Sequence, residues 1–297
     1  MVKLYDVMSI TKAAIGLCYF KKYGVNSKVP IPGFEDTTFF QALNHTSKYS
    51  EACWYYNEFR DAVDSNQNLL EYCKKTLQSC NTTKPKQPDN TYLWEYNDLM
   101  YQVLACSMKD LVETFAQIMG DRFISDLKKD SDGTYHVEGD GWRWEHTKSG
   151  TPLGPHGLEM SEEAAKKLGV VMTRTFKSDF PRVEIPRGAW LGIGKDEFKF
   201  YCYGWFFSRH TAFAVGYVVQ VIAVSPDQVR IQLYDEDWDP NGNFMDNDKN
   251  RFKHPRWSFV KTIVEADKKF DDKKYWDNPA LSADLSLERG KKVLLKF

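Results

Sequence analysis

A series of β-branched and aromatic runs in the second half of the chain constrains its fold most. Gly, Pro, Ser and Asp residues separate these runs, which are RVEIPRGAWLGIG, EFKFYCYGWFF, AFAVGYVVQVIAV, QVRIQLYDED and WSFVKTIVEA. Such composition between turn residues is typical of β-strands. Consecutive strands that are joined by short turns pair in antiparallel fashion. The pattern therefore predicts an antiparallel sheet that curls into a small barrel or a sandwich.

The first part of the chain has a helical period instead. Residues 9–24 place apolar side chains at helical spacing, with a serine at the expected N-cap and a glycine after the last turn. A second apolar pattern covers residues 36–80 with a break near residues 64–68, and a third covers residues 93–123. Three or four helices with short connections predict an antiparallel bundle.

The pattern changes near residue 130. Asp-Gly turns flank a short strand-like segment, TYHVE, and a connector rich in Gly and Pro, GTPLGPHG, follows. We therefore predict an α+β protein with a helical domain over residues 1–130, a hairpin and linker over residues 131–160, and a β-rich domain over residues 161–297. A short helix should open this last domain, starting at Ser161 and ending at Gly169.

The charge balance gives no sign of nucleic-acid binding. The chain has 40 basic and 41 acidic residues, a formal net charge of -1, and no basic tail or arm. No apolar run approaches the roughly 18 residues that a membrane-spanning helix needs. The partner that we expect is another protein.

The cysteines predict a reduced protein. Six cysteines in 297 residues are too few for a disulfide scaffold, and no Cys-x-x-Cys pair occurs. We expect free thiols in the core. No signal peptide is evident, so we expect synthesis in the cytoplasm, with later export left open.

The stretch DEDWDPNGNFMDND, residues 235–248, contains a dense group of acidic side chains. Alternate positions around a glycine bend can direct hard oxygen ligands to one calcium ion or another divalent cation. Pro240 and the strand-like residues before the stretch do not fit an ordinary calcium loop. The ligands in this interpretation are Asp237, Asp239, Asn241, Asn243 and Asp248.

Two other interpretations compete with the cation site. The tetrapeptide DPNG has the residue preferences of a type I turn, so the stretch is also explained as a polar hairpin tip, which is the interpretation that we favour. Alternatively, Asp235 and Asp237 point the same way on a strand and would form a catalytic carboxylate pair.

Cys202 and His210 are a further pair of catalytic candidates. Eight residues of extended chain would separate them by roughly 26 Å, so a cysteine–histidine dyad requires the chain to fold back. The aromatic neighbours of Cys202 favour an inert core thiol instead.

The segment GDGWRWEH contains alternating tryptophans. Trp142 and Trp144 beside Glu145 would suit a ligand-binding platform on which a sugar stacks. Alternate tryptophans on a hairpin also cover a neighbouring apolar face, and we favour that use.

These patterns leave two functional hypotheses. The first is a binding or interaction protein that presents an acidic, cation-binding hairpin, because no catalytic constellation is complete. The alternative is a hydrolase, metal-assisted or not, of the secreted-effector, toxin or cell-wall-degrading type, which uses the Asp-rich loop or the Cys202 and His210 pair. Whether the protein is an enzyme stays open at this stage.

Overall fold

The fold is known from a computed structural model. The structure describes residues 2–24, 30–50, 56–80, 84, 86–88, 92–122, 124–175, 182–186, 200–207, 212–216, 220–225, 228–233, 285–287 and 292–293. The helices are α1 (Ile10–Tyr23), α2 (Phe39–Leu43), α3 (Tyr56–Asp64), α4 (Leu69–Ser79), α5 (Asp98–Ser107), α6 (Leu111–Met119) and α7 (Glu162–Thr175).

The strands form three sheets. The eight-stranded sheet has the order β15-β14-β13-β12-β11-β10-β9-β8, the five-stranded sheet has the order β1-β7-β6-β5-β4, and β2 pairs with β3. Their bounds are β1 (Tyr5–Asp6), β2 (Pro30–Ile31), β3 (Phe34–Thr38), β4 (Ile124–Lys129), β5 (Tyr135–Gly139), β6 (Trp142–His146), β7 (Leu158–Met160), β8 (Val183–Glu184), β9 (Phe200–Cys202), β10 (Trp205–Phe207), β11 (Ala212–Gly216), β12 (Gln220–Ser225), β13 (Gln228–Gln232), β14 (Leu285–Leu287) and β15 (Lys292–Val293).

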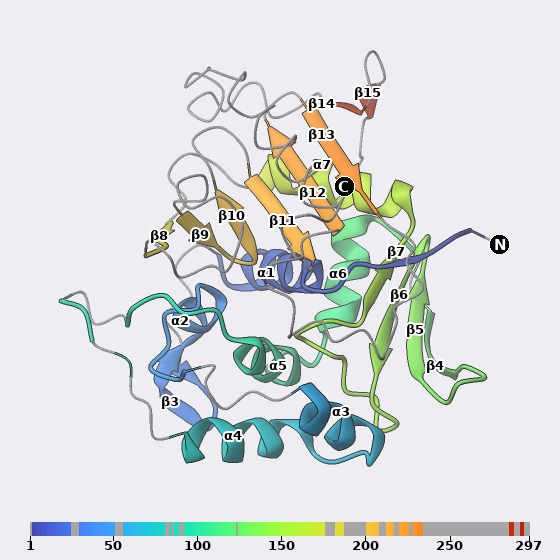
Figure 1. Cartoon of the computed structure of the whole chain (residues 1–297). Coiled ribbons are helices and arrows are strands. Elements are labelled where there is room, and N and C mark those ends of the chain that lie inside the picture. Colours follow the sequence, from blue (N-terminus) through green and yellow to red (C-terminus); the bar gives the residue numbers. More distant parts are fainter. Residues whose placement is uncertain are drawn as a thin grey trace, which may run out of the picture.

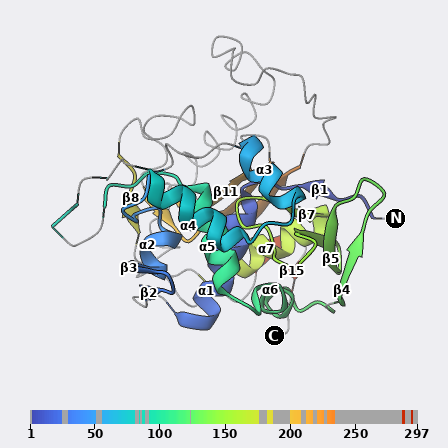
Figure 2. The same cartoon turned by 90° about the horizontal axis from the view of Figure 1, so that it is seen from below.

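The helices are interleaved with the sheets. Helices α1 and α7 pack against β11, β12 and β13, on one face of the large sheet, and α6 packs against both helices (Figure 1). Helices α2 to α5 lie below the large sheet in Figure 1 and therefore toward the viewer in Figure 2. The buried hydrophobic side chains of all these parts join in one cluster.

The α+β class is confirmed, but the predicted barrel or sandwich is wrong. The described strands of the large sheet form an open sheet covered by helices, and all their pairings are antiparallel except that of β13 with β14. Strands with apolar side chains on both faces need a cover, and helices α1 and α7 cover one face here. The predicted domain boundaries stay a prediction.

Several local predictions fail for packing reasons. The expected single helix over residues 93–123 is divided into α5 and α6 at residues 108–110. Ser161 does start α7, since its Oγ accepts a hydrogen bond from Ala164 N, but Gly169 lies inside this helix. An added Cβ at Gly169 would lie 2.5 Å from Val229 Cγ1. The glycine therefore permits close helix–sheet contact and does not end the helix.

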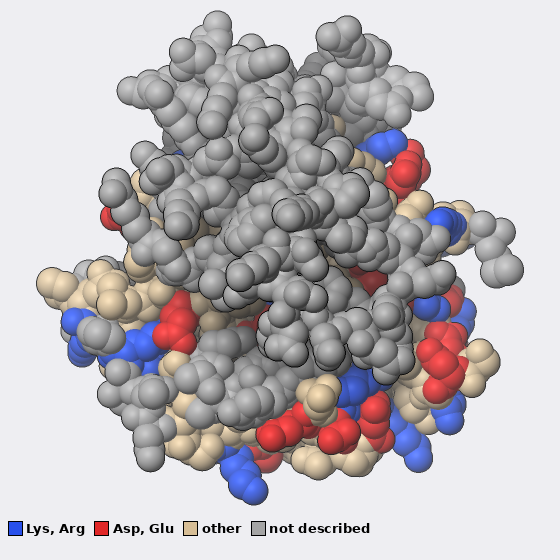
Figure 3. All heavy atoms as spheres, in the orientation of Figure 1, with Lys and Arg blue, Asp and Glu red and all other residues tan. Residues whose placement is uncertain are grey.

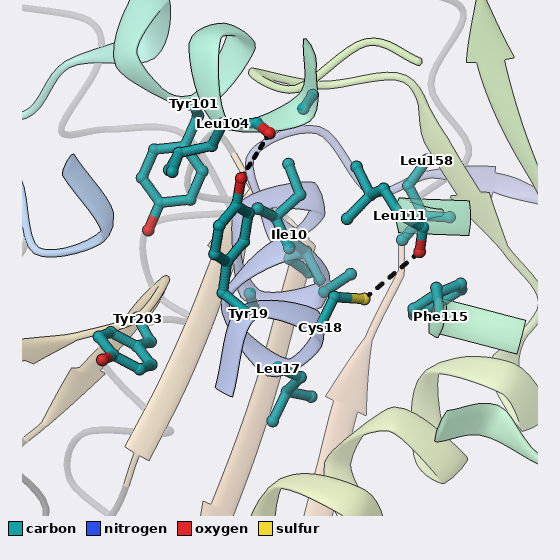
Figure 4. Packing of buried hydrophobic residues seen from close by; sticks show 14 of the residues in the cluster. Ile10, Leu17, Cys18, Tyr19, Tyr101, Leu104, Leu111, Phe115, Leu158 and Tyr203 are labelled. Carbon is teal, nitrogen blue, oxygen red and sulfur yellow. Dashed lines mark hydrogen bonds between the residues drawn. The ribbon is translucent and has the colours of Figure 1, made fainter. Parts of the chain in front are cut away.

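Helix α1 is the centre of the molecule. Every residue from Ile10 to Tyr19 is buried, which requires apolar side chains nearly all around a helix. Figure 4 shows this packing, in which Tyr19 donates a hydrogen bond to Leu104 O at 2.8 Å. In the same view the Cys18 thiol lies 3.7 Å from Leu111 O. The helix is thus held on several sides at once.

A close backbone contact fixes α1 against the large sheet. Tyr203 and Gly204 connect β9 to β10 with positive φ angles of 49° and 90°, the conformation of a type I′ hairpin turn. An added Cβ at Gly16 would lie 1.9 Å from Tyr203 O, and one at Gly204 would lie 2.5 Å from the Ala13 backbone. Glycine is therefore required on both sides of this contact.

The surface and the cysteines add three facts. Acidic and basic side chains lie beside one another on the described part of the face in Figure 3. None of the described helices is long and apolar enough to cross a membrane. Cys18, Cys73, Cys106 and Cys202 are free thiols, whereas Cys80 is disulfide-bonded, so the expectation of reduced cysteines is wrong for Cys80.

Candidate functional site

The predicted acidic site cannot be placed. Its residues, together with His210, lie outside the described residues; they are Asp235, Asp237, Asp239, Asn241, Asn243 and Asp248. The cation site, the carboxylate pair and the dyad of Cys202 with His210 therefore stay predictions. Among the residues that the structure does describe, no group of three or more His, Cys, Asp or Glu side chains could hold a metal ion.

Cys202 lies on β9 with no exposed surface. Burial raises the pKa of its thiol well above the usual value. A thiol is nucleophilic only as the thiolate. The position of Cys202 therefore gives an inert core residue.

The two tryptophans of β6 are buried in the core. Trp142 donates from Nε1 to Asp121 Oδ2 at 2.8 Å, and Trp144 donates to Leu153 O at 2.8 Å. Both rings meet the ring of Phe115 edge-on. As placed, these indoles cover an apolar face and offer no exposed platform for a ligand.

Glu145 alternates with these tryptophans along β6 and faces the other way. Its Oε1 lies 2.6 Å from Arg60 Nη1. Burial raises the pKa of the Glu145 carboxyl, and Arg60 acts against this rise. The carboxylate therefore serves to hold α3 against the five-stranded sheet.

The structure instead brings together a serine and a lysine at the start of α1. Ser9 is the N-cap residue, as the sequence predicts, but its side chain makes no capping hydrogen bond. Its backbone is helical (φ −66°, ψ −6°), whereas a capping serine is normally extended. Its Oγ lies 2.9 Å from Lys12 Nζ, one turn further along the helix.

Lys12 is an unusual core residue. Its side chain is 1% exposed, and a buried lysine needs partners for its charge and its hydrogens. Its Nζ lies 2.7 Å from Pro155 O and 2.5 Å from Asp98 Oδ1. The same nitrogen lies 4.9 Å from the centroid of the Tyr96 ring. Oxygen atoms and an aromatic face thus surround the amine.

A tight turn between β1 and α1 presents Ser9. Val7 donates from its backbone N to Leu158 O, which ties the turn to β7. Met8 has a φ of 50°, a region that side chains other than glycine seldom adopt, and its N donates to Asp6 Oδ1. The strand therefore reverses abruptly into the helix and leaves Ser9 only partly buried.

His45 holds the segment that carries Tyr96 and Asp98. Asn97 donates from its backbone N to His45 Nδ1 at 3.0 Å, so the ring hydrogen is on Nε2, which lies 3.0 Å from Tyr201 Oη. Burial lowers the pKa of His45 well below its usual value, and Lys12 adds to this effect. The neutral imidazole thus accepts from the backbone of this segment while it packs 4.5 Å from the Tyr96 ring, centroid to centroid.

The arrangement can perform nucleophilic catalysis. A serine becomes nucleophilic when a neighbouring base accepts its proton, and a distance of 2.6 to 3.2 Å between the two is typical of such pairs. Ser9 and Lys12 meet that condition. The N-terminus of α1 also favours negative charge that develops at Ser9.

Sequence reasoning missed this pair because each residue has an ordinary explanation. Ser9 is explained as an N-cap, and a lysine in the first turn of a helix is common. The available signal was Lys12 at i+3 from the cap serine inside the apolar run ITKAAIGL, where the helix has no solvent-exposed face for it. Its partners Asp98 and Pro155 are remote in sequence and gave no signal.

No family model matches the sequence, and no curated protein matches it either. Solved structures do. A penicillin binding protein from Bacillus halodurans is 14% identical, with a TM-score of 0.50 over 89% of this chain and 85% of that chain. The octameric penicillin-binding protein homologue from Pyrococcus abyssi is 14% identical, with a TM-score of 0.47 over 76% of this chain and 60% of that one. EstCE1, a hydrolase with promiscuous acyltransferase activity, is 15% identical, with a TM-score of 0.46 over 76% and 77%.

The first likeness shows the fold, and the other two, with TM-scores below 0.5, add no argument. The expectation of a binding or interaction protein is wrong, because this fold and the contact of the partly buried Ser9 with the buried Lys12 agree better with the alternative, a hydrolase. The pair also differs from the residues named in that alternative. The chain therefore has the mixed α+β fold of a penicillin-binding protein.

Proposed function

We propose that the protein is a serine hydrolase or acyltransferase that forms an acyl-enzyme on Ser9, with Lys12 as the base. The observation that carries this proposal is the distance of 2.9 Å between Ser9 Oγ and the buried Lys12 Nζ at the start of α1. A Ser-x-x-Lys sequence supplies the nucleophile in penicillin-binding proteins and class A β-lactamases. The fold likeness to a penicillin-binding protein supports the same role for Ser9 here.

The acylation step follows from the geometry. The neutral Lys12 amine takes the hydroxyl proton of Ser9 while Oγ forms a bond to the carbonyl carbon of an ester or amide. The bond to the leaving group then breaks, and the leaving group departs with the proton that Lys12 accepted. Water or another acceptor nucleophile later releases the acyl group, and Ser9 regains its proton.

The helix dipole and the residues beside Lys12 would assist this acylation. The positive end of the α1 dipole lies at Ser9 and stabilises an oxyanion formed there. The partly buried ring of Tyr96 lies 4.9 Å from Lys12 Nζ, centroid to nitrogen, and so forms one side of the site. The substrate class that this arrangement suits is an activated ester, an amide or a β-lactam.

Covalent labelling tests the proposal. The full chain is incubated with p-nitrophenyl acetate and, separately, with a fluorescent penicillin, and the modified peptide is identified by mass spectrometry. We expect an acyl adduct on Ser9 from at least one probe, and its loss in Ser9→Ala.

The matched control is Ser79→Ala, which removes an exposed hydroxyl at the end of α4 that donates to Thr76 O. This variant should label like the wild type. A folded wild-type protein that neither probe modifies, or an adduct that persists in Ser9→Ala, would contradict the proposal.

A further inference from the structure

His45 follows α2 in a conformation that its surroundings must maintain. Its φ is 57°, a left-handed region that few residues other than glycine adopt. The residue is fully buried, and its ring packs against two tyrosines, with centroid distances of 4.5 Å to Tyr96 and 4.7 Å to Tyr201. Backbone strain persists only where neighbouring contacts require it, so the contacts of this histidine call for an explanation.

The backbone and the side chain of His45 both accept hydrogen bonds from the segment just before α5. Glu95 N donates to His45 O at 3.0 Å, and Asn97 N donates to His45 Nδ1 at 3.0 Å. Tyr96 lies between these two donors, and the centroid of its ring is 4.9 Å from Lys12 Nζ. His45 therefore holds, from behind, the aromatic ring that forms one side of the site.

Tyr201 supplies the acceptor that the other ring nitrogen of His45 needs. Burial lowers the pKa of His45 well below its usual value, so the imidazole is neutral and has a single N–H. Because Nδ1 accepts from Asn97 N, this hydrogen is on Nε2, which donates to Tyr201 Oη at 3.0 Å. Tyr101 donates its own hydroxyl hydrogen to Leu43 O at 2.6 Å, so it can only accept from Tyr201 Oη, which lies 3.5 Å away. These groups are thus compatible with one arrangement of their hydrogens.

This network joins the large sheet to the site. Tyr201 lies on β9 and is buried. Without its hydroxyl, the hydrogen on Nε2 of His45 would have no acceptor there, and a buried donor without an acceptor is costly. A move of the hydrogen to Nδ1 would place it against the N–H of Asn97, and two donors cannot bond to each other. The Tyr201 hydroxyl therefore keeps the imidazole in the form that accepts from the segment of Tyr96.

We propose that His45 is a positioning residue that ties the Tyr96 side of the site to β9, and that the Tyr201 hydroxyl selects the tautomer of His45 that does so. The inference rests on the proposed function, because it concerns the rate at which Ser9 is acylated. His45 acts through Tyr96, whose ring packs on the imidazole on one side and faces the Lys12 amine on the other. A shift of about 1 Å in groups around the reacting atoms can cost about a hundredfold in rate.

Two substitutions separate the two ring nitrogens of His45. Asparagine places its side-chain oxygen near the position of Nδ1 and can still accept from Asn97 N, whereas glutamine places its amide nitrogen near the position of Nε2 and can still donate to Tyr201. The rate of Ser9 acylation by p-nitrophenyl acetate, or by the fluorescent penicillin, is measured in both. We expect His45→Asn to stay within about threefold of the wild type and His45→Gln to fall by about tenfold or more. Urea denaturation should show similar losses of stability, because each variant keeps one of the two hydrogen bonds.

Two spectroscopic measurements read the proposed contacts directly. The nitrogen spectrum of the imidazole in the wild-type protein should show the hydrogen on Nε2 and none on Nδ1. Hydrogen exchange of the Asn97 backbone amide should be slow in the wild type and in His45→Asn. The same amide should exchange faster in His45→Gln, because the hydrogen bond that protects it is lost.

Tyr201→Phe is the milder variant, and Tyr19→Phe is its matched control. Each removes one hydroxyl from a buried tyrosine, and the hydroxyl of Tyr19 donates to Leu104 O at 2.8 Å. We expect Tyr201→Phe to slow acylation by at least about threefold and Tyr19→Phe to stay within about twofold of the wild type. This pair decides the matter if the His45 variants do not fold.

The outcomes separate the two proposals. A wild-type protein that is not acylated on Ser9 contradicts the proposed function and, with it, this inference. A wild-type protein that is acylated, with equal rates in His45→Asn and His45→Gln or in Tyr201→Phe and Tyr19→Phe, overturns the role of His45 alone. A hydrogen found on Nδ1 of the wild-type imidazole would also overturn it, because Asn97 N could then not donate to this ring.

Discussion

The two ends of α1 carry the same kind of ion pair in opposite settings. At the first turn, Lys12 is 1% exposed and contacts Asp98, whose side chain is 23% exposed. At the last turn, Lys22 is 36% exposed and contacts Asp110, which is 44% exposed. A buried ion pair often contributes little to stability compared with apolar residues of similar size. The Lys22 pair is explained by the helix dipole and solvent, whereas the Lys12 pair calls for a reason other than stability.

The difference agrees with the role proposed for Lys12. Exposed lysines in the last turn of a helix are favoured by the dipole, so Lys22 needs nothing further. Lys12 lies at the opposite end, where the dipole is unfavourable for a cation, and inside the core. Its position is explained by the three residues that contact its amine, which are Ser9, Asp98 and Pro155.

The largest difference between the two ends of α1 is expected when each lysine is replaced by methionine. Lys12→Met should reduce Ser9 acylation by about a thousandfold, within the range for loss of a general base. Lys22→Met should leave the rate within about twofold of the wild type, because the exposed pair is remote from Ser9. Stopped-flow measurement of acyl-enzyme formation checks both. Equal losses in the two variants would refute a specific role for Lys12.

A glycine inside α1, Gly16, and the glycine at its C-cap, Gly24, extend the comparison to packing. Gly16→Ala should lower the free energy of unfolding by about 3 kcal/mol, because the new methyl group meets Tyr203 O. Gly24→Ala at the C-cap meets no atom within 4 Å and has a φ of 71°, so only backbone strain of about 1 kcal/mol is expected. Urea denaturation measures both values. A Gly16→Ala variant no less stable than Gly24→Ala would show that the contact with the sheet is not tight.

Acid should lower the stability of the fold through His146, which is buried in its neutral form. His146 is 5% exposed, and burial lowers its pKa from 6.5 to about 4. Because the folded state resists protonation that the unfolded state accepts, stability is lost as the pH falls below about 6.5. The loss between pH 7 and pH 5 is about 2 kcal/mol for this group.

His146→Gln should reduce that loss. The measurement is the thermal midpoint from pH 7 to pH 5, with Lys22→Met as the exposed control that should keep the wild-type slope. An unchanged slope in the folded His146→Gln variant would assign the acid sensitivity to other groups, such as His45.

The sequence was informative where structure is local. The helix start at Ser9, the stop at Gly24 and the strand around Tyr135 are set by neighbours within a few positions, and the structure has all three, although the Ser9 side chain does not cap the helix. The site was not local. Pro155 lies 143 positions from Lys12, and Tyr201 lies 156 positions from His45. The dense acids of residues 235–248 form a visible pattern because they are contiguous, whereas the setting of Ser9 and Lys12 depends on remote contacts.

The carbonyl of Pro155 reaches Lys12 only in the folded chain. Gly154 lies so close to α5 that an added Cβ would be 2.1 Å from Tyr101 O, and this contact places Pro155 over Lys12. Pro155 follows Lys12 by 143 positions, so the amine meets this carbonyl only once the chain has folded over that length. In an unfolded chain, Ser9 and Lys12 would be an ordinary solvated serine and lysine.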